Sequence, residues 1–208
     1  MKISYAILTH NEHEYIEKLI QYLVQNKRSQ DEIVVVDDYS EGITKAVLEE
    51  HAIDGNIKLY HNSLEGNFAK QKNFLITKCS GDWIFNIDAD EIPEYILMRD
   101  FQKIIEANSS EAFFVPRVNI VDGMTDSDAM RWRWSVNPEG WVNWPDWQLR
   151  IFKNDYPRIS WNNPVHEQLT GFESYSFFPD KKEYALMHRK TIQRQTIQNE
   201  FYQKIQLS

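Results

Sequence analysis

The 208-residue sequence contains a single cysteine, Cys79, which excludes an internal disulfide and a zinc site built from cysteines. Positive charge is also in short supply, because 23 Lys and Arg face 31 Asp and Glu, a formal net charge of −8. Proteins that bind duplex nucleic acid usually carry a basic surface, so we predict no nucleic-acid partner. No charged-then-apolar leader opens the chain, and no apolar run approaches the roughly 18 residues of a membrane helix. We therefore expect a cytoplasmic protein without a transmembrane segment.

Two glycine-based phosphate-binding motifs are absent as well. No G-x-G-x-x-G follows the first strand-like segment, and no G-x-x-x-x-G-K-[ST] occurs anywhere in the chain. The backbone cradle that dehydrogenases and P-loop enzymes build at a helix N-terminus is therefore excluded. If the protein binds phosphate groups, a metal ion has to neutralise them.

The first hundred residues alternate between strand-like and helix-like segments. Apolar runs predict strands at 3–8, 33–36, 57–60 and 83–87. Helices are predicted at 16–24 and 68–79, and between them a further helix is predicted that Ser40 would cap. Alternation at these lengths predicts an α/β fold with a doubly wound, mostly parallel, Rossmann-like sheet and helices on both faces. We expect one domain over residues 1–208, because no linker or repeat interrupts the chain.

Three of the predicted strands end in polar or acidic residues, at the edge where parallel sheets bind ligands. These residues are Thr9-His10-Asn11-Glu12, Asp37-Asp38 and Asp88-Ala89-Asp90. The last group is the most informative, because two carboxylates directly after a buried strand repel each other unless a cation or hydrogen-bond donors compensate. Mg²⁺ or Mn²⁺ bridging a diphosphate is such a cation. Together the three loops predict a nucleotide site.

The order of these motifs resembles glycosyltransferase family 2, whose members have the GT-A fold. The resemblance includes the stretch from Gly66 to Asn73 and Gly81-Asp82-Trp83-Ile84. Further along, residues 161–167 (WNNPVHE) and 186–189 (LMHR) are similar to later motifs of bacterial and phage members that act on lipopolysaccharide core or other glycans. The resemblance implies one GT-A domain, with a nucleotide-sugar-binding half at 1–110 and an acceptor-binding half at 111–208 that ends in a helix.

The activity that the resemblance implies is the metal-dependent, inverting transfer of a hexose. The donor would be a nucleotide-diphosphate sugar, a UDP-sugar such as UDP-glucose, and the acceptor a glycan, a lipid-linked saccharide or another hydroxyl compound. The implied donor-site residues are Thr9, His10, Asn11, Asp37, Asp38, Lys72, Asp88 and Ala89.

Within this donor site, the resemblance gives individual residues different roles. Thr9 and His10 would border the uracil, and Asp38 would accept from its imide N–H, with Asp37 as the alternative. Lys72 would offset phosphate charge. Asp88 would bind the ribose hydroxyls or a metal-bound water. The sequence departs from the family at Tyr39, where glycine is usual.

The implied chemistry also needs a metal site and a base. Asp90, with Asp88 beside it, would coordinate Mn²⁺ or Mg²⁺, and His188 is the candidate for the remaining protein ligand, with His166 as the alternative. For the base that takes the proton of the acceptor hydroxyl we favour Glu167, which follows an Asn-Asn-Pro turn. Asp146 is the second candidate.

The second half offers two further features. Five of the chain's 7 tryptophans lie between Met130 and Trp147, and they predict either an acceptor-binding loop that packs on sugar rings or a plug in the core. Residues 121–128 lack periodicity, which predicts a loop. Past residue 188, the apolar positions Ile192, Ile197, Phe201 and Ile205 predict a C-terminal helix that packs on the domain or docks against a second subunit.

Two other functions stay open at this point. A nucleotidyltransferase or sugar-nucleotide pyrophosphorylase uses a related sheet but usually begins with a glycine-rich, basic phosphate loop, which is not found between Leu8 and Lys18. A non-catalytic carbohydrate-binding protein would keep the sheet and the tryptophans without turnover. The carboxylates Asp88, Asp90 and Glu167 favour an enzyme over this second alternative.

Overall fold

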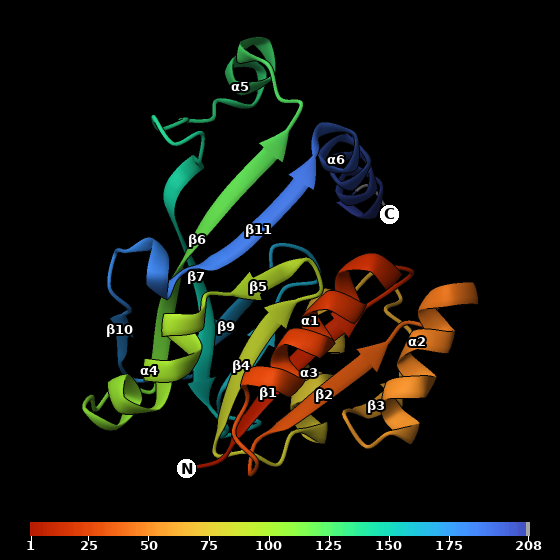
Figure 1. The fold of residues 1–208 in the computed structure, drawn as a ribbon, viewed down its shortest axis with the longest axis vertical. Helices are drawn as coiled ribbons and strands as arrows, with labels where there is room; N and C mark the ends of the chain where they lie inside the picture. Colours follow the sequence, from red (N-terminus) through yellow and green to blue (C-terminus); the bar gives the residue numbers. More distant parts are fainter. Residues whose placement is uncertain (207–208) are drawn as a thin grey trace.

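Strands and helices alternate through the first half of the chain in the computed structural model, which describes the backbone of residues 1–206 and the side chains of residues 1–199 (Figure 1). The strands are β1 (Ile3–Thr9), β2 (Glu32–Asp37), β3 (Lys58–His61), β4 (Trp83–Asp88), β5 (Glu91–Pro93), β6 (Ala112–Asp122), β7 (Val142–Lys153), β8 (Ser160–Asn162), β9 (Gln168–Thr170), β10 (Tyr175–Phe177) and β11 (Leu186–Thr191). The helices are α1 (His13–Asn26), α2 (Gly42–Ile53), α3 (Phe68–Lys78), α4 (Tyr95–Glu106), α5 (Asp126–Trp132), the 3₁₀ turn η1 (Lys182–Tyr184) and α6 (Ile192–Gln206).

One large sheet runs through both halves. Among the described residues its strand order is β3-β2-β1-β4-β7-β6-β11-β5, with β10 added beside β6. Strands β3, β2, β1 and β4 are parallel, whereas β7 runs antiparallel to both β4 and β6. The prediction of an α/β fold with a mostly parallel sheet is confirmed, and β7 is the strand that joins the two halves.

Helices cover both faces of the first half of the sheet, and the strand side chains alternate between the two. Tyr5 and Phe85 belong to the core under α1 and α4, together with Leu19 and Phe101. The intervening residues, such as Ala6, face α3 and the β8–β9 hairpin on the other side. Because both faces are covered, these strands appear in the sequence as almost continuous apolar runs.

The second helix begins later than the sequence suggested. Glu41, not Ser40, holds the cap position of α2. The hydroxyl of Ser40 instead donates to Asp37 Oδ1 (2.5 Å), and its backbone N–H donates to Asp37 Oδ2 (2.9 Å). The prediction of a Ser40 cap was wrong because the buried Asp37 carboxylate needs these donors more than the helix end does.

The loop predicted over 121–128 is also only partly correct, because α5 begins at Asp126. Thr125 Oγ1 accepts from the backbone N–H of Asp128 (3.3 Å), and the Thr125 N–H donates to Asp128 Oδ2 (2.9 Å). This reciprocal capping box satisfies two N–H groups at the helix start. A short helix with a local cap needs no apolar periodicity, and the periodicity argument therefore missed it.

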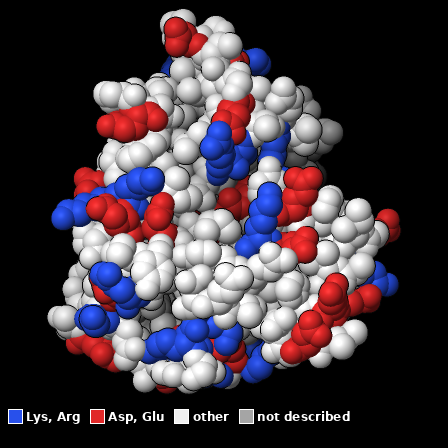
Figure 2. All heavy atoms as spheres, in the orientation of Figure 1, with Lys and Arg blue, Asp and Glu red and all other residues white. Residues whose placement is uncertain are grey.

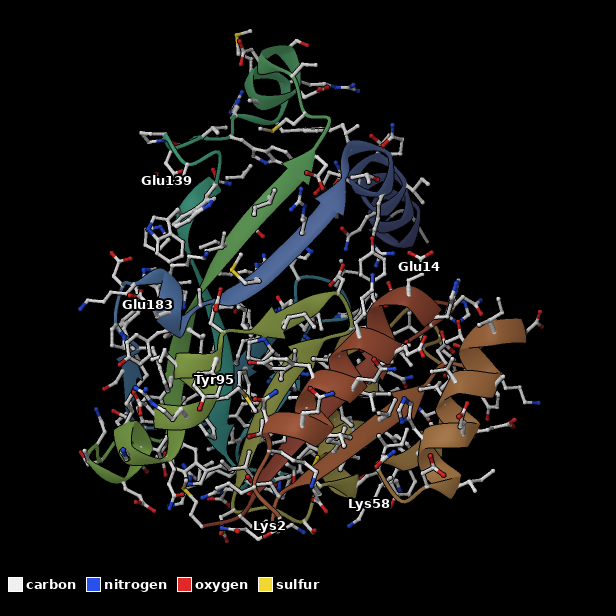
Figure 3. All side chains as sticks on the ribbon, viewed as in Figure 1. Lys2, Glu14, Lys58, Tyr95, Glu139 and Glu183 are labelled. Carbon is white, nitrogen blue, oxygen red and sulfur yellow. The ribbon has the colours of Figure 1, made fainter. Side chains whose placement is uncertain are left out.

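Charged side chains at the amino ends of the strands form a cluster that is remote from the ligand-binding edge. The Nζ atoms of Lys2 and Lys58 lie 3.0 and 2.6 Å from Glu32 Oε2. Figure 3 shows both lysines at the lower edge of the molecule, whereas Glu14, in the first turn of α1, lies about halfway up the view. Burial raises the pKa of Glu32, but hydrogen bonds from Lys58, Ser4 and Lys2 outweigh it and hold the pKa below its ordinary value.

The surface and the C-terminal helix bear on the expected partners. On the face drawn in Figure 2, basic and acidic side chains are interspersed. None of the helices in the described chain combines the length and apolar character that crossing a membrane requires. The C-terminal helix is confirmed as α6, but Ile197 is 67% exposed. Phe201 and Ile205 lie outside the residues whose side chains are described.

Candidate active site

Two cavities meet at the carboxyl edge of the sheet. The first has a volume of about 510 Å³ and the second about 370 Å³, and both are lined by Asp88, Asp90 and Gln198. The predicted donor-site residues in the wall of the first cavity are Thr9, His10, Asp38, Lys72, Asp88 and Ala89. Glu167 also lines the first cavity, whereas Asp146 and His188 line the second. The two candidates for the base therefore lie on different sides of the acidic pair.

Two predicted donor-site residues, Asn11 and Asp37, do not line the first cavity but brace its loops. The Asn11 N–H donates to Ser40 Oγ (2.8 Å), and the Glu41 N–H donates to Asn11 Oδ1 (2.9 Å). Asp37 is 1% exposed, and both of its carboxylate oxygens accept from Ser40. Asn11 and Asp37 thus connect the loop after β1 to the loop after β2.

The side chains that do face this end of the cavity are held in defined orientations. His10 Nδ1 donates to the Asp38 carbonyl oxygen (2.7 Å), because Asn11 Nδ2 donates to the other ring nitrogen (3.0 Å). Asp38 Oδ1 accepts from the Leu64 N–H (3.0 Å). The buried Thr9 Oγ1 has no hydrogen-bond partner in the described structure. A buried hydroxyl without a partner in a cavity wall fits a site that a polar ligand completes.

Tyr39, the departure from the family pattern, has a backbone φ of 51°. Glycine adopts this left-handed conformation at little cost, which explains why glycine is usual at this position. The Tyr39 ring stacks on His61, with 5.8 Å between the ring centres. The turn after Asp38 therefore keeps a glycine-like backbone despite the larger side chain.

Asp90 and His188 bring a carboxylate and an imidazole together between the two cavities. His188 Nε2 lies 3.3 Å from Asp90 Oδ2, and His188 Nδ1 lies 2.7 Å from Asn119 Oδ1. Because Asn119 Nδ2 donates to Asp146 (2.8 Å), its Oδ1 is an acceptor and His188 Nδ1 carries a proton. Nε2 therefore faces Asp90, as a hydrogen-bond donor when it carries a proton and with its lone pair when it does not. A carboxylate and an oriented imidazole lone pair are the ligand types that a divalent transition metal binds.

The other predicted metal ligands are arranged differently. His166 is exposed and lines neither cavity, and Asp88 is paired with Arg150. Burial raises the pKa of Asp88, but the charges of Arg150 and Lys72 outweigh it and lower the pKa to about 2. Within the described residues, no group of three or more His, Cys, Asp and Glu is arranged to hold a metal ion. Asp90 and His188 are therefore the pair that fits a metal.

Arg194, near the start of α6, covers this pair from the side of the first cavity. Its Nη2 lies 3.2 Å from Asp90 Oδ2 and also donates to Glu12 Oε1. The guanidinium carbon lies 4.2 Å from the centre of the Tyr15 ring. Burial raises the pKa of Asp90, but the His188 hydrogen bond and the charges of His188 and Arg194 outweigh it and hold the pKa below its ordinary value.

Glu167, the base that the sequence favoured, is engaged in a part-buried ion pair with Lys72. Its Oε1 lies 2.5 Å from Lys72 Nζ, and the two side chains are 19% and 8% exposed. The Lys72 ammonium also lies 4.3 Å from the centre of the Trp161 ring. The pair joins α3 to the segment between β8 and β9 and closes one wall of the first cavity.

The tryptophan-rich segment does not plug the core. All five tryptophans between Met130 and Trp147 are half-buried, and they are absent from both core clusters of the described chain. Trp132 packs against Trp134 and Trp141 against Trp144, with 4.7 and 5.1 Å between ring centres. Trp134 lines the second cavity. The interpretation of these rings as a plug in the core is therefore wrong: Trp144 and Trp147 lie on β7, the other three lie on α5 or in the loop before β7, and none joins a core cluster of the described residues.

Sequence reasoning missed three charged residues that surround the acidic pair. Arg117 lines the second cavity and pairs with the fully buried Glu91, which also pairs with the buried Arg150. Arg117 and Arg150 stand inside the apolar strands β6 and β7. A charged residue in an apolar strand is costly to bury without a partner, and this was the available signal.

Comparison with known proteins identifies the family. The chain matches glycosyl transferase family 2 over residues 4–191. A glycosyltransferase of Rickettsia bellii is 30% identical over 120 residues, which cover 58% of this chain and 38% of the relative. The lipopolysaccharide core biosynthesis glycosyltransferase LpsC of Rhizobium meliloti is 36% identical over 92 residues, which cover 44% of this chain and 32% of LpsC.

Comparison with solved structures supports the assignment of the fold. The crystal structure of Staphylococcus aureus TarS residues 1–349 matches with a TM-score of 0.66 at 17% identity, covering 91% of this chain and 60% of that one. The chain thus spans less than two thirds of the length of each of these relatives. The family match along nearly the whole chain and the shared architecture lead to one conclusion: the chain belongs to glycosyltransferase family 2 and has the GT-A fold.

Proposed function

We propose that this chain is a metal-dependent, inverting glycosyltransferase that transfers a hexose from a UDP-sugar to a hydroxyl group of a glycan or lipid-linked saccharide. The observation that carries the proposal is the pair Asp90 and His188, which lies where a donor-sized cavity meets a second cavity. One cavity then holds the nucleotide and the other the acceptor.

The first cavity suits the nucleotide end of the donor. Thr9 offers an unpartnered hydroxyl, and Asp38 lines the cavity with a carboxylate of which Oδ1 is held by the Leu64 N–H. Asp38 is a better candidate than Asp37 for reading the uracil N–H, because Asp37 is buried against Ser40. The TarS structure with UDP-GlcNAc, similar to this chain at a TM-score of 0.64, supports a nucleotide-sugar donor. Lys72 and Arg194 supply positive charge along the same wall.

Asp90 and His188 would hold Mn²⁺ or Mg²⁺, with the remaining ligands supplied by the donor diphosphate and water. Such a cation supplies Lewis-acid stabilisation of the charge that develops on the leaving diphosphate. The neutral imidazole of His188 suits Mn²⁺. Asp88, held by Arg150, would accept hydrogen bonds from the ribose.

Asp146 is the better candidate for the base. In an inverting displacement the attacking oxygen approaches the anomeric carbon from the side opposite the diphosphate, so the base belongs in the acceptor cavity. Asp146 lines that cavity, whereas Glu167 lines the donor cavity and accepts from Lys72. The acceptor oxygen forms the new bond to the anomeric carbon and gives its proton to Asp146. The bond to the diphosphate breaks, and its electron pair leaves with the phosphate oxygen.

The test is calorimetric binding of UDP-sugars and free nucleotides with Mn²⁺ and with a chelator, followed by assays of UDP release. We expect a UDP-sugar to bind only with the metal and to be hydrolysed slowly without an acceptor. Asp146→Asn should bind that donor normally and lose about 10²–10⁴-fold in turnover. Metal-independent binding would contradict the proposal. Oligosaccharide binding without any UDP-sugar binding would favour a carbohydrate-binding protein instead.

A further inference from the structure

A buried chain of alternating charges connects the two sides of the candidate active site. Glu91 Oε1 accepts from Arg117 Nη1 (2.9 Å) and from Arg150 Nη2 (2.7 Å). Arg150 continues to Asp88, and Arg117 continues to Asp146. Glu91 Oε2 accepts from the backbone N–H of Asp88 (3.1 Å), which fixes the acidic pair from beneath. Glu91 is therefore the centre of a bridge between the donor-side and acceptor-side carboxylates.

Arg117 holds Asp146 through one of its two oxygens. Arg117 Nε (2.8 Å) and Nη2 (2.6 Å) both donate to Asp146 Oδ2, which also accepts from Asn119 (2.8 Å). Oδ1 accepts only from Gln148 Nε2 (2.8 Å) among the described residues. The carboxylate is thus oriented so that Oδ1 is the oxygen with an available lone pair. Because Asp146 lines the second cavity, Oδ1 is the oxygen that we expect an acceptor hydroxyl there to contact.

We propose that Arg117, anchored by the buried Glu91, is a positioning residue that keeps Asp146 ionised and turns its Oδ1 toward the acceptor. The inference rests on the proposed function, in which Asp146 is the base. A guanidinium suits this task because its planar fork contacts two carboxylates at once in a fixed geometry, which an ammonium does not reproduce.

The electrostatics of Asp146 agree with this geometry. Burial raises its pKa, but the charge of Arg117 and the hydrogen bonds from Asn119 and Arg117 outweigh burial and lower the pKa. The other titratable or charged groups that line the cavity are Asp88 at the end of β4, Asp90 in the turn after it, and His188 and Lys190 from β11. Arg117, which touches the carboxylate, is the dominant cation, and its removal should raise the pKa.

The experiment compares Arg117→Gln with Arg117→Lys, which keeps the charge but not the fork. UDP release from UDP-glucose or UDP-N-acetylglucosamine is followed against pH with saturating Mn²⁺, and water takes the place of the acceptor. In Arg117→Gln we expect the acid limb of kcat/KM to move to higher pH by about 1–2 units. Arg117→Lys should keep the limb near its wild-type position with a smaller loss of kcat. Donor binding measured by calorimetry should be unchanged in both variants.

The same substitution in the Asp146→Asn variant separates a positioning role of Arg117 from a general structural effect. Adding Arg117→Gln to Asp146→Asn should cost no further turnover, because the group through which Arg117 acts is already gone. If Arg117→Gln alone does not fold, Glu91→Gln with Arg117→Gln removes one buried charge of each sign and takes its place. Two results would overturn the positioning role alone. One is an acid limb in Arg117→Gln at the same pH as in Arg117→Lys. The other is a loss of turnover on adding Arg117→Gln to Asp146→Asn that equals the loss on adding it to the wild type. Wild-type turnover in Asp146→Asn overturns the base assignment and the inference with it.

Discussion

The Lys72–Glu167 pair allows a direct test of whether Glu167 is a structural carboxylate or the base. Removing one partner of a fully buried pair costs about 3–5 kcal/mol. Glu167→Gln keeps an acceptor oxygen for Lys72, and Glu167 is 19% exposed, so we expect a smaller loss. Because the substitution weakens a hydrogen bond between two charged groups to one with a neutral acceptor, we expect a loss of about 1–2 kcal/mol in the free energy of unfolding. For a chain of this length that corresponds to a decrease in Tm of about 2–8 °C.

Thermal denaturation and UDP release, measured on the same preparation, decide the question. Turnover should stay within about threefold of wild type, because a base contributes about 10²–10⁴-fold and we assign that role to Asp146. Glu65→Gln is the matched control, since Glu65 forms an exposed pair with Lys70 (3.1 Å) and should change stability by less than about 1 kcal/mol. An unchanged Tm with a loss of turnover above about 100-fold would refute the reasoning and restore Glu167 as the base.

Three further predictions concern the metal, the backbone and the cysteine. Asp90→Asn should weaken Mn²⁺ binding in the presence of UDP by more than about 100-fold in calorimetry. Asp126→Asn, on α5 and outside both cavities, should leave the affinity unchanged, and equal affinities would remove Asp90 from the metal site. Gly171→Ala should lower the free energy of unfolding by at least about 3 kcal/mol in urea, because a Cβ there would lie 1.8 Å from the Arg158 carbonyl oxygen. Gly140→Ala, also at positive φ but with no atom within 4 Å, should cost about 1 kcal/mol, and similar losses would show that the contact relaxes. Burial raises the pKa of Cys79 to about 12, so at pH 8 a disulfide reagent should react more than about tenfold faster in urea than with the native protein. Equal rates would show that the thiol is accessible.

Local pattern was sufficient for the first half of the fold. Strands such as 33–36 and 83–87 were predictable because a strand covered on both faces needs apolar residues throughout. The polar groups that follow each strand were predictable as neighbours, because parallel strands bring their carboxyl ends to one edge. Thr9, His10, Asp38 and Asp88 accordingly line one cavity in the structure.

The local sequence pattern could not predict which of two neighbouring residues, Asp37 or Asp38, faces the cavity. Asp37 and Asp38 are equivalent in the sequence, but β2 ends at Asp37, whose buried side chain accepts from Ser40. Asp38 follows the strand and faces the first cavity. The choice between them depends on where the pleat of the strand ends and on which donors the next loop supplies, and neither is visible from composition.

The sequence by itself determined the α/β class, the three loops at the carboxyl edge and the family to which the chain belongs. Only the tertiary structure decided which distant residues share the site. Asp90 meets His188 because β5 pairs with β11 at Glu91 and His188. Asp146 meets Arg117 because the antiparallel β7 lies beside β6. Such contacts depend on strand order and register across a hundred residues of chain, whereas periodicity and spacing report only what neighbouring residues impose on one another.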